Sequence, residues 1–206
     1  MYTKKLSGIV FDLDNTLVSS TLNFEQIRLA LGCPVDVDLL KFVDSLDDHR
    51  KVEAEKLLIE FEVEDAKNTT KFEGTDELIA LLNYTNIPCA IITRNCRQAA
   101  QMKIESNAIN IPILLTREDH KAKPAPDALL HLSHYWQKPA EQLLYVGDYL
   151  YDIQTAKNAN TMSCLITHGK KLPYAKLADY VVKDLNQLIR LVSTAFNLQI
   201  LDEASL

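Results

Sequence analysis

Short apolar runs alternate with stretches of helical spacing along most of this chain, and this alternation restricts its fold more than any other feature. The spacing of an amphipathic helix appears, for example, at Leu78, Leu81 and Leu82. Strands that alternate with helices form a parallel sheet with helices on both faces. We therefore expect an α/β fold. The predicted strands are Gly8–Phe11, Cys89–Thr93, Ile113–Leu115, Leu143–Val146, Ser163–Ile166 and Tyr180–Val182.

One region interrupts the alternation. From about Ser19 to Thr70 the pattern is helical, with segments over 24–31 and 37–46 and a longer one that places Leu57, Leu58 and Phe61 on one face. We expect residues 18–71 to form a small all-helical cap, and residues 1–17 and 72–206 to form the core. The alternative is that these helices simply continue the layer of helices that covers the sheet.

Composition excludes several function classes. The chain has 206 residues, 47% of them hydrophobic, and a formal charge of −6, which argues against binding to nucleic acid. No apolar run reaches the roughly 18 residues that a membrane span requires. The apolar run behind Lys4 and Lys5 is too short for a secretory signal. The four cysteines form no paired motif, so we expect a cytoplasmic protein.

Polar residues follow four of the predicted strands and loops. Because parallel strands end at one edge of the sheet, these side chains are expected to converge there. Several carboxylates at one point repel each other unless a cation joins them, and Mg²⁺ suits such hard oxygen donors. A lysine and a hydroxyl add a charge and a donor for a phosphoryl group. The candidates are Asp12, Asp14, Thr93, Lys123, Asp148 and Asp152.

These residues occur in four short motifs. They are DxDxT at 12–16, Thr93 at a strand end, Lys123 in KPAPD, and GDxxxD at 147–152. In this order they resemble the signature motifs of the haloacid dehalogenase superfamily, and the helical insert resembles the cap of its phosphoglycolate-phosphatase-like members. The resemblance implies a Rossmann-like sheet with the first strand central.

The resemblance also implies a role for each residue. Asp12 would be the nucleophile, and Asp14 the general acid and base, with Thr16 helping to orient it. Thr93 and Lys123 would hold the phosphoryl oxygens, helped by backbone N–H groups near Leu13 and Arg94. Mg²⁺ would be bound by Asp12, by the Asp14 carbonyl, by Asp148, and by Asp152 directly or through water.

The predicted activity is that of a Mg²⁺-dependent phosphatase acting on a small soluble phosphate monoester. Asp14 favours phosphoryl transfer, because the resemblance implies that dehalogenases lack an aspartate there. A phosphomutase of the same fold and a non-catalytic regulatory or binding member are the alternatives. Lys121 competes with Lys123 for the phosphate, although the KPxPD context favours Lys123. The sequence leaves the substrate and the oligomeric state open.

Overall fold

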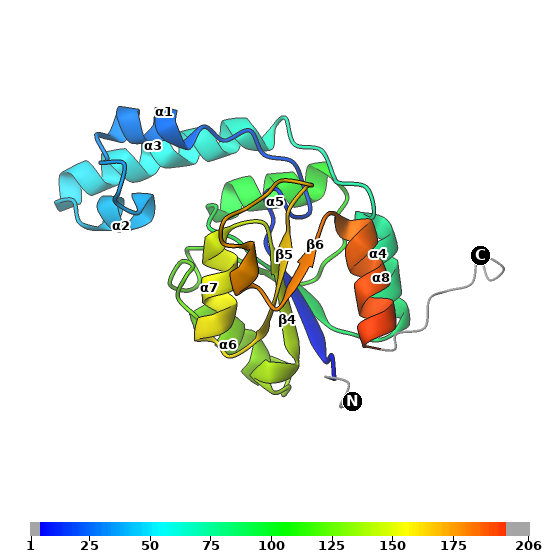
Figure 1. Cartoon of the computed structure of the whole chain (residues 1–206). Coiled ribbons are helices and arrows are strands. Elements are labelled where there is room, and N and C mark those ends of the chain that lie inside the picture. Colours follow the sequence, from blue (N-terminus) through cyan, green and yellow to red (C-terminus); the bar gives the residue numbers. More distant parts are fainter. Residues whose placement is uncertain (1–4, 197–206) are drawn as a thin grey trace.

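A six-stranded parallel sheet forms the centre of the molecule, seen here in a computed structural model that describes residues 5–196. Residues 1–4 and 197–206, which fall in the predicted core segments, lie outside the described part. The strand order is β3-β2-β1-β4-β5-β6, so that β1 lies centrally between β2 and β4 (Figure 1). All six predicted strands are confirmed, with ends that move by at most one residue. They are β1 (Gly8–Phe11), β2 (Cys89–Ile92), β3 (Leu114–Leu115), β4 (Leu143–Gly147), β5 (Met162–Ile166) and β6 (Tyr180–Val182).

Helices cover both faces of the sheet, because successive residues of a strand point to opposite sides. Ile9 and Phe11 face one cluster of buried side chains, and Val10 faces the other. The first cluster is covered by α4 (Thr75–Tyr84), α5 (Arg97–Ser106) and α8 (Leu185–Ala195), and the second by α6 (Asp127–Tyr135) and α7 (Leu150–Asn158). Two short 3₁₀ helices, η1 (Ala140–Gln142) and η2 (Ala175–Leu177), complete the connections.

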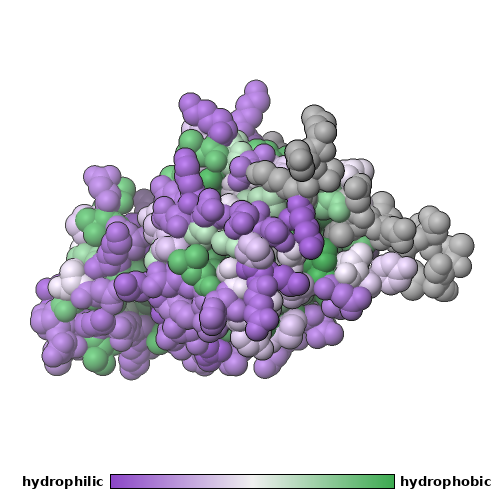
Figure 2. All heavy atoms as spheres, turned by 90° about the horizontal axis from the view of Figure 1, so that it is seen from below, coloured by the Kyte–Doolittle hydropathy of each residue, from purple (hydrophilic) through white to green (hydrophobic). Residues whose placement is uncertain are grey.

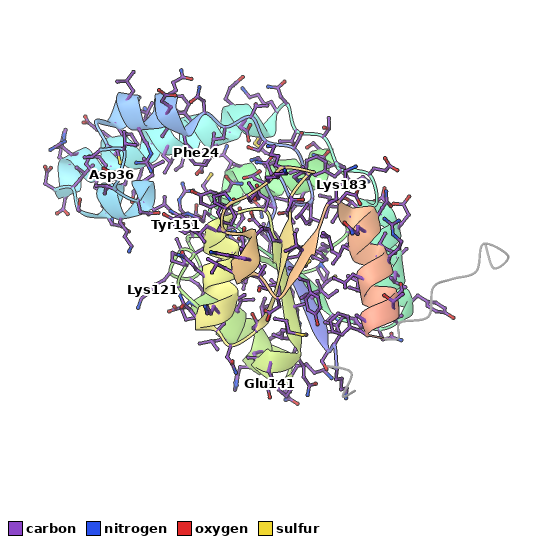
Figure 3. The ribbon with its side chains drawn as sticks, viewed as in Figure 1. Phe24, Asp36, Lys121, Glu141, Tyr151 and Lys183 are labelled. Atoms are coloured by element: carbon purple, nitrogen blue, oxygen red, sulfur yellow. The ribbon has the colours of Figure 1, made fainter. Side chains whose placement is uncertain are left out.

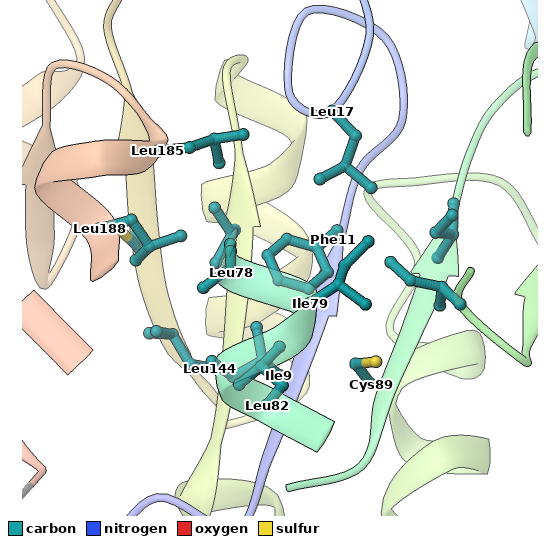
Figure 4. Close-up of a cluster of buried hydrophobic side chains, with 14 of the residues drawn as sticks. Ile9, Phe11, Leu17, Leu78, Ile79, Leu82, Cys89, Leu144, Leu185 and Leu188 are labelled. Carbon is teal, nitrogen blue, oxygen red and sulfur yellow. The ribbon is translucent and has the colours of Figure 1, made fainter. Parts of the chain in front are cut away.

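The larger cluster fixes the strand end that carries the first aspartates. In Figure 4, Ile9 and Phe11 of β1 lie against Leu78 and Leu82 of α4. These four side chains are fully buried. Burying a side chain of this size stabilises the fold by about 1.5–3 kcal/mol. The end of β1 is therefore held rigidly in the middle of the sheet.

Three helices follow β1 in the chain and lie above the sheet in Figure 1. They are α1 (Phe24–Leu31), α2 (Leu39–Asp44) and α3 (Asp48–Ala66). Each begins at a side chain that accepts a hydrogen bond from a backbone N–H in its first turn, and these caps are Asn23, Asp38 and Asp47. A small apolar cluster holds the three helices together, and it includes Ile27, Cys33, Leu39 and Leu58. This helical insert after β1 confirms the predicted fold class.

The two ends of the insert join the core at neighbouring points. The N–H of Ser19 donates to the carbonyl of Thr70 at 2.8 Å, and Val18 forms an antiparallel bridge with Lys71. The two segments that enter and leave the insert therefore run side by side. The carboxyl-terminal end of α3 also packs on the core, where Ala66 contacts the cluster that contains Cys96 and Ala99 of the α5 region.

Within residues 5–196, no helix combines the length and the apolar character that crossing a bilayer requires. The face seen from below in Figure 2 is mainly hydrophilic, and hydrophobic atoms on it occur in small separate areas. The four cysteines are free and buried.

Candidate active site

Three carboxylates meet where β1 and β4 end. Asp12 directly follows β1, and its backbone N–H donates to the carbonyl of Val146 in β4 at 2.8 Å. Asp148 directly follows β4, and Asp152 lies in the first turn of α7. One oxygen atom from each of these three aspartates lies within 4.8 Å of the others. Neighbouring parallel strands end at the same edge of the sheet, so the strand order itself produces this convergence.

Lys123 supplies the positive charge at this point. Its Nζ lies 2.7 Å from Oδ1 of Asp12 and 2.7 Å from Oδ1 of Asp152. Lys123 is buried in the loop before α6, whereas Lys121 is exposed, and Figure 3 shows Lys121 at the periphery of the core. Of the two lysines that the sequence left in competition, the structure brings Lys123 to the carboxylates.

Gly147 at the end of β4 makes room for this arrangement. A Cβ atom on Gly147 would lie 2.2 Å from Cγ of Asp152, far inside the contact distance of two carbon atoms. The other carboxylate oxygen of Asp152 accepts a hydrogen bond from the N–H of Tyr149 at 3.0 Å. The Gly-Asp sequence after β4 therefore does more than form a turn, because it lets Asp152 pack against the strand end.

The cluster carries more negative charge than Lys123 can offset. Burial raises the pKa of Asp12 to about 7; Lys123 opposes this rise, and the neighbouring carboxylates of Asp152 and Asp14 add to it. Burial also raises the pKa of Asp148 to about 8, with Asp12 and Asp152 adding to the effect. Hard oxygen donors that resist sharing one site without a further cation fit a divalent ion such as Mg²⁺.

Two donors from the core hold the Asp14 carboxylate. Nδ2 of Asn95 donates to Oδ2 at 2.6 Å, and Nζ of Lys103 donates to Oδ1 at 2.5 Å. The hydroxyl of Thr16, which was expected to help orient Asp14, is buried and has no hydrogen-bond partner among residues 5–196. The hydrogen bonds that orient the Asp14 carboxylate therefore come from Asn95 and Lys103.

Thr93 and Arg94 follow β2 but point to different places. Thr93 is buried, lines the same cleft as Asp12, and its Oγ1 accepts the N–H of Asn95 at 3.1 Å. The guanidinium of Arg94 instead donates to both carboxylate oxygens of Asp38, at 2.9 and 2.7 Å. It also lies 4.7 Å from the centre of the Tyr151 ring. The side chain of Arg94 thus joins the core to the start of α2 in the insert.

A cleft of about 500 Å³ separates the cluster from the insert. Its core side contains Asp12, Asp148 and Tyr151, and its insert side contains the apolar side chains of Phe24 and Leu39. Figure 3 shows Phe24 on the insert and Tyr151 on the core below it. The polar floor and the partly apolar roof are suited to a ligand with one anionic end.

The sequence matches the family model of the haloacid dehalogenase-like hydrolases over residues 19–166, which is more than half of the chain. The chain belongs to this family. The match begins after β1, so the positions of Asp12 and Asp14 in this haloacid dehalogenase-like hydrolase rest on the sheet geometry and on the sequence motif.

Relatives of this haloacid dehalogenase-like hydrolase match along nearly its whole length. It is 28% identical to a haloacid dehalogenase-like hydrolase domain-containing protein of Arabidopsis thaliana, over 94% of this chain and 86% of the relative. It is 26% identical to a phosphoglycolate phosphatase of Photobacterium profundum, over 91% of this chain and 96% of the relative. A solved hydrolase structure from Pseudomonas syringae superposes with a TM-score of 0.77 at 18% identity, over 91% of this chain and 98% of that one. The predicted family and fold are confirmed, and the predicted phosphatase class agrees with the names of relatives such as the phosphoglycolate phosphatase of Photobacterium profundum.

The sequence did not reveal the residues that hold the side chains of Asp14 and Arg94 in place. Lys103 and Asn95 contact Asp14, and Asp38 contacts Arg94, yet none of these contacts follows from a motif. A signal for Lys103 exists in hindsight. It lies four residues after Ala99 and three after Ala100, both buried, so it occupies the buried face of α5.

Proposed function

We propose that this hydrolase is a Mg²⁺-dependent phosphatase that cleaves a small phosphate monoester through an aspartyl-phosphate on Asp12. The observation that carries the proposal is the cluster of Asp12, Asp148 and Asp152 around Lys123, at the carboxyl end of a parallel sheet. Ligands of open α/β sheets bind at this edge.

The metal site is proposed from the same residues. Carboxylate oxygens of Asp12 and Asp148 and the backbone carbonyl of Asp14 would hold Mg²⁺, with Asp152 contributing directly or through water. When bound, the ion supplies positive charge next to the phosphoryl oxygens and the nucleophile. The raised pKa values of Asp12 and Asp148 support this assignment, because a divalent ion offsets the loss of hydration and the repulsion that raise them.

Asp12 and Lys123 act in the first step of the proposed reaction. A carboxylate oxygen of Asp12 attacks phosphorus, and the bond from phosphorus to the leaving oxygen breaks. Lys123, which contacts Asp12, donates to the phosphoryl oxygens, and so does the hydroxyl of Thr93, a residue that lines the same cleft. Such preorganised donors reduce the repulsion between an anionic nucleophile and a phosphate dianion.

Asp14 moves the protons. In the first step it gives a proton to the leaving oxygen, so that the alcohol departs neutral. In the second step its carboxylate takes a proton from a water molecule that attacks phosphorus. The bond from phosphorus to Asp12 then breaks and inorganic phosphate leaves.

Residues 18–71 act as a cap over the reaction in this proposal, and residues 1–17 and 72–206 as the core. The insert side of the cleft is partly apolar, and it receives the part of the ester that is not phosphate. The cleft volume of about 500 Å³ suits a small soluble substrate. We place the enzyme in the cytoplasm, in keeping with four free cysteines.

The test is hydrolysis of p-nitrophenyl phosphate by the purified full chain. Activity should vanish in a chelator and return with excess Mg²⁺. Ca²⁺ should restore it poorly, because its larger and looser coordination shell misaligns the nucleophile. Full activity in the chelator would contradict the proposed dependence on Mg²⁺.

Replacing the nucleophile tests the intermediate. Asp12→Asn should abolish turnover, because a carboxamide is a poor nucleophile and a weaker metal ligand. The measurement is phosphate release, together with trapping of radiolabelled phosphate on the wild-type chain and its absence on the variant. A variant that keeps full turnover would overturn the mechanism.

A further inference from the structure

A second buried lysine lies behind the proposed general acid and base. The side chain of Lys103 on α5 is fully buried, and its Nζ contacts Oδ1 of Asp14 at 2.5 Å and Oδ2 of Asp65 at 2.8 Å. An ammonium group loses its hydration when it is buried, so it must be matched by well-placed acceptors. Lys103 has two carboxylates as acceptors, one from the active-site loop and one from the insert.

Asp65 connects this lysine to the segment that enters the insert. It lies at the end of α3 and is buried. Its Oδ1 accepts the N–H of Thr21 at 2.8 Å, and its Oδ2 accepts the hydroxyl of Ser20 at 2.7 Å. The hydrogen bonds therefore run without a break from the linker before α1, through Asp65 and Lys103, to Asp14.

The contacts of Asp14 show why this network bears on the chemistry. Both of its oxygens accept hydrogen bonds from fixed donors, one from Asn95 and one from Lys103. The side chain of Asp14 is 22% exposed, and the residue lines the cleft. Lys103 thus helps to hold the Asp14 carboxylate in one orientation at the edge of the cleft.

We propose that Lys103 is a positioning residue for Asp14. Because Lys103 also pairs with Asp65, the position of the Asp14 carboxylate then depends on how the insert packs on the core. This inference rests on the proposed function, because it assigns Asp14 the transfer of the proton to the leaving group. A purely structural ion pair would instead stabilise the fold and leave the balance between substrates unchanged.

The experiment compares two esters in single-turnover reactions of the full chain with Mg²⁺. The leaving group of p-nitrophenyl phosphate needs little protonation, whereas that of glycerol phosphate needs a great deal. Lys103→Met should lower the rate of phosphoenzyme formation from glycerol phosphate by about ten- to a hundredfold. It should lower the rate from p-nitrophenyl phosphate by less than about threefold, because that step depends little on proton transfer.

Asp65→Asn should shift the ratio of the two rates in the same direction by a smaller factor, since Lys103 keeps its bond to Asp14. Arg117→Met is the matched control. It removes another ion pair between the core and the insert, that of Arg117 with the buried Glu62 at 2.6 Å, which does not contact Asp14. Any loss in this control should be equal for the two esters.

A double-mutant cycle gives the sharpest readout. In an Asp14→Asn background the ester-dependent effect of Lys103→Met should disappear, because residues that act through one group are not additive. Folded Lys103→Met with a wild-type ratio of rates would overturn the inference. If Lys103→Met does not fold, Asp65→Asn decides, and an unchanged ratio in that variant overturns it.

Failure of this inference is distinguishable from failure of the proposed function. If the wild-type chain transfers phosphate from neither ester, or if Asp12→Asn remains active, then the proposed function has failed. Suppose instead that the wild type is active, that Asp12→Asn is inactive, and that substituting Lys103 or Asp65 leaves the ratio of the rates for the two esters unchanged. Then only the positioning role has failed.

Discussion

Two buried lysines, Lys123 and Lys103, each bridge two aspartates, yet their surroundings differ. Lys123 lies among three carboxylates at the strand ends. Lys103 lies between two carboxylates, one of which also accepts hydrogen bonds from the Ser20 hydroxyl and the Thr21 backbone. The first cluster has an excess of negative charge. In the second, neutral hydrogen-bond donors satisfy the carboxylate oxygens that Lys103 does not contact or contacts only in part.

The pKa values reflect this difference. Burial raises the pKa of Asp12 to about 7 and that of Asp148 to about 8, because Lys123 only partly offsets the loss of hydration and the repulsion. Burial acts in the same direction on Asp65, but hydrogen bonds from Lys103 and Ser20 outweigh it, and the pKa of Asp65 is lowered. Of the two buried lysines, the one at the proposed metal and phosphate site is therefore the one that leaves its carboxylates with raised pKa values.

The largest effect should come from removing the lysine at the first cluster. Lys123→Met should reduce the turnover of every phosphate ester by about 10² to 10³ or more, because it removes a charge that faces the phosphoryl group. Lys103→Met should spare the formation of the phosphoenzyme from p-nitrophenyl phosphate. The measurement is the single-turnover rate of phosphoenzyme formation for the two variants on both esters. The same dependence on the ester in both variants would erase the distinction between the two lysines.

The second effect concerns the metal. Gly147→Ala should weaken Mg²⁺ binding by about 10- to 100-fold, because its Cβ displaces the Asp152 carboxylate. Asp65→Asn should leave Mg²⁺ affinity unchanged, because Asp65 belongs to the other cluster. Titration calorimetry with Mg²⁺ alone, on both variants, tests this. An equal loss in the two variants would mean that the clusters are not independent.

The smallest effect is an opposite dependence of stability on pH. The folded pKa values of Asp12 and Asp148 lie above the unfolded value near 4, so their contribution is fully present below about pH 4 and is lost as the pH rises toward 8. The folded pKa of Asp65 is lowered, so its contribution is present above about pH 4 and is lost as the pH falls further.

Denaturant unfolding at pH 5.5 and pH 8, in chelator and in Mg²⁺, measures the first of these trends. The free energy of unfolding in chelator should fall between the two pH values, and Mg²⁺ should restore more at pH 8, where fewer protons compete for the carboxylates. Asp148→Asn serves as the control and should flatten the trend in chelator. If the free energy of unfolding of this variant falls as steeply between the two pH values as that of the wild type, Asp148 is not the cause of the fall.

Much of the fold was predictable because its signals are local. Each strand is a compact apolar run, and the ends moved by at most one residue. Helix α5 was not singled out, because its buried residues are Ala99, Ala100 and Lys103 rather than large apolar side chains. A face defined by alanines and a lysine becomes visible only once the elements that pack on it are known.

The candidate site divides in the same way. Asp12, Lys123 and Asp148 follow strands or a motif, and the order of the strands brings them together. The contacts from Lys103 to Asp14 and from Arg94 to Asp38 join residues 89 and 56 positions apart in the chain. The contact of Arg94 with Asp38 depends on how the insert lies over the core, and that of Lys103 with Asp14 depends on how α5 packs beside β1. No local sequence pattern predicts either arrangement. Thr16 illustrates the converse, since its place in the motif implied a part in orienting Asp14, whereas its hydroxyl has no hydrogen-bond partner among residues 5–196.

The pairing of Ser19 with Thr70 has a consequence for how such a chain can change over evolution. Both ends of the insert meet at one point, and the bridge between Val18 and Lys71 fixes the distance between them. The entropy of closing a loop grows only slowly with its length. The length of the insert can therefore change, together with its residues that do not pair with the core, while β1 keeps its register and Asp12 its place.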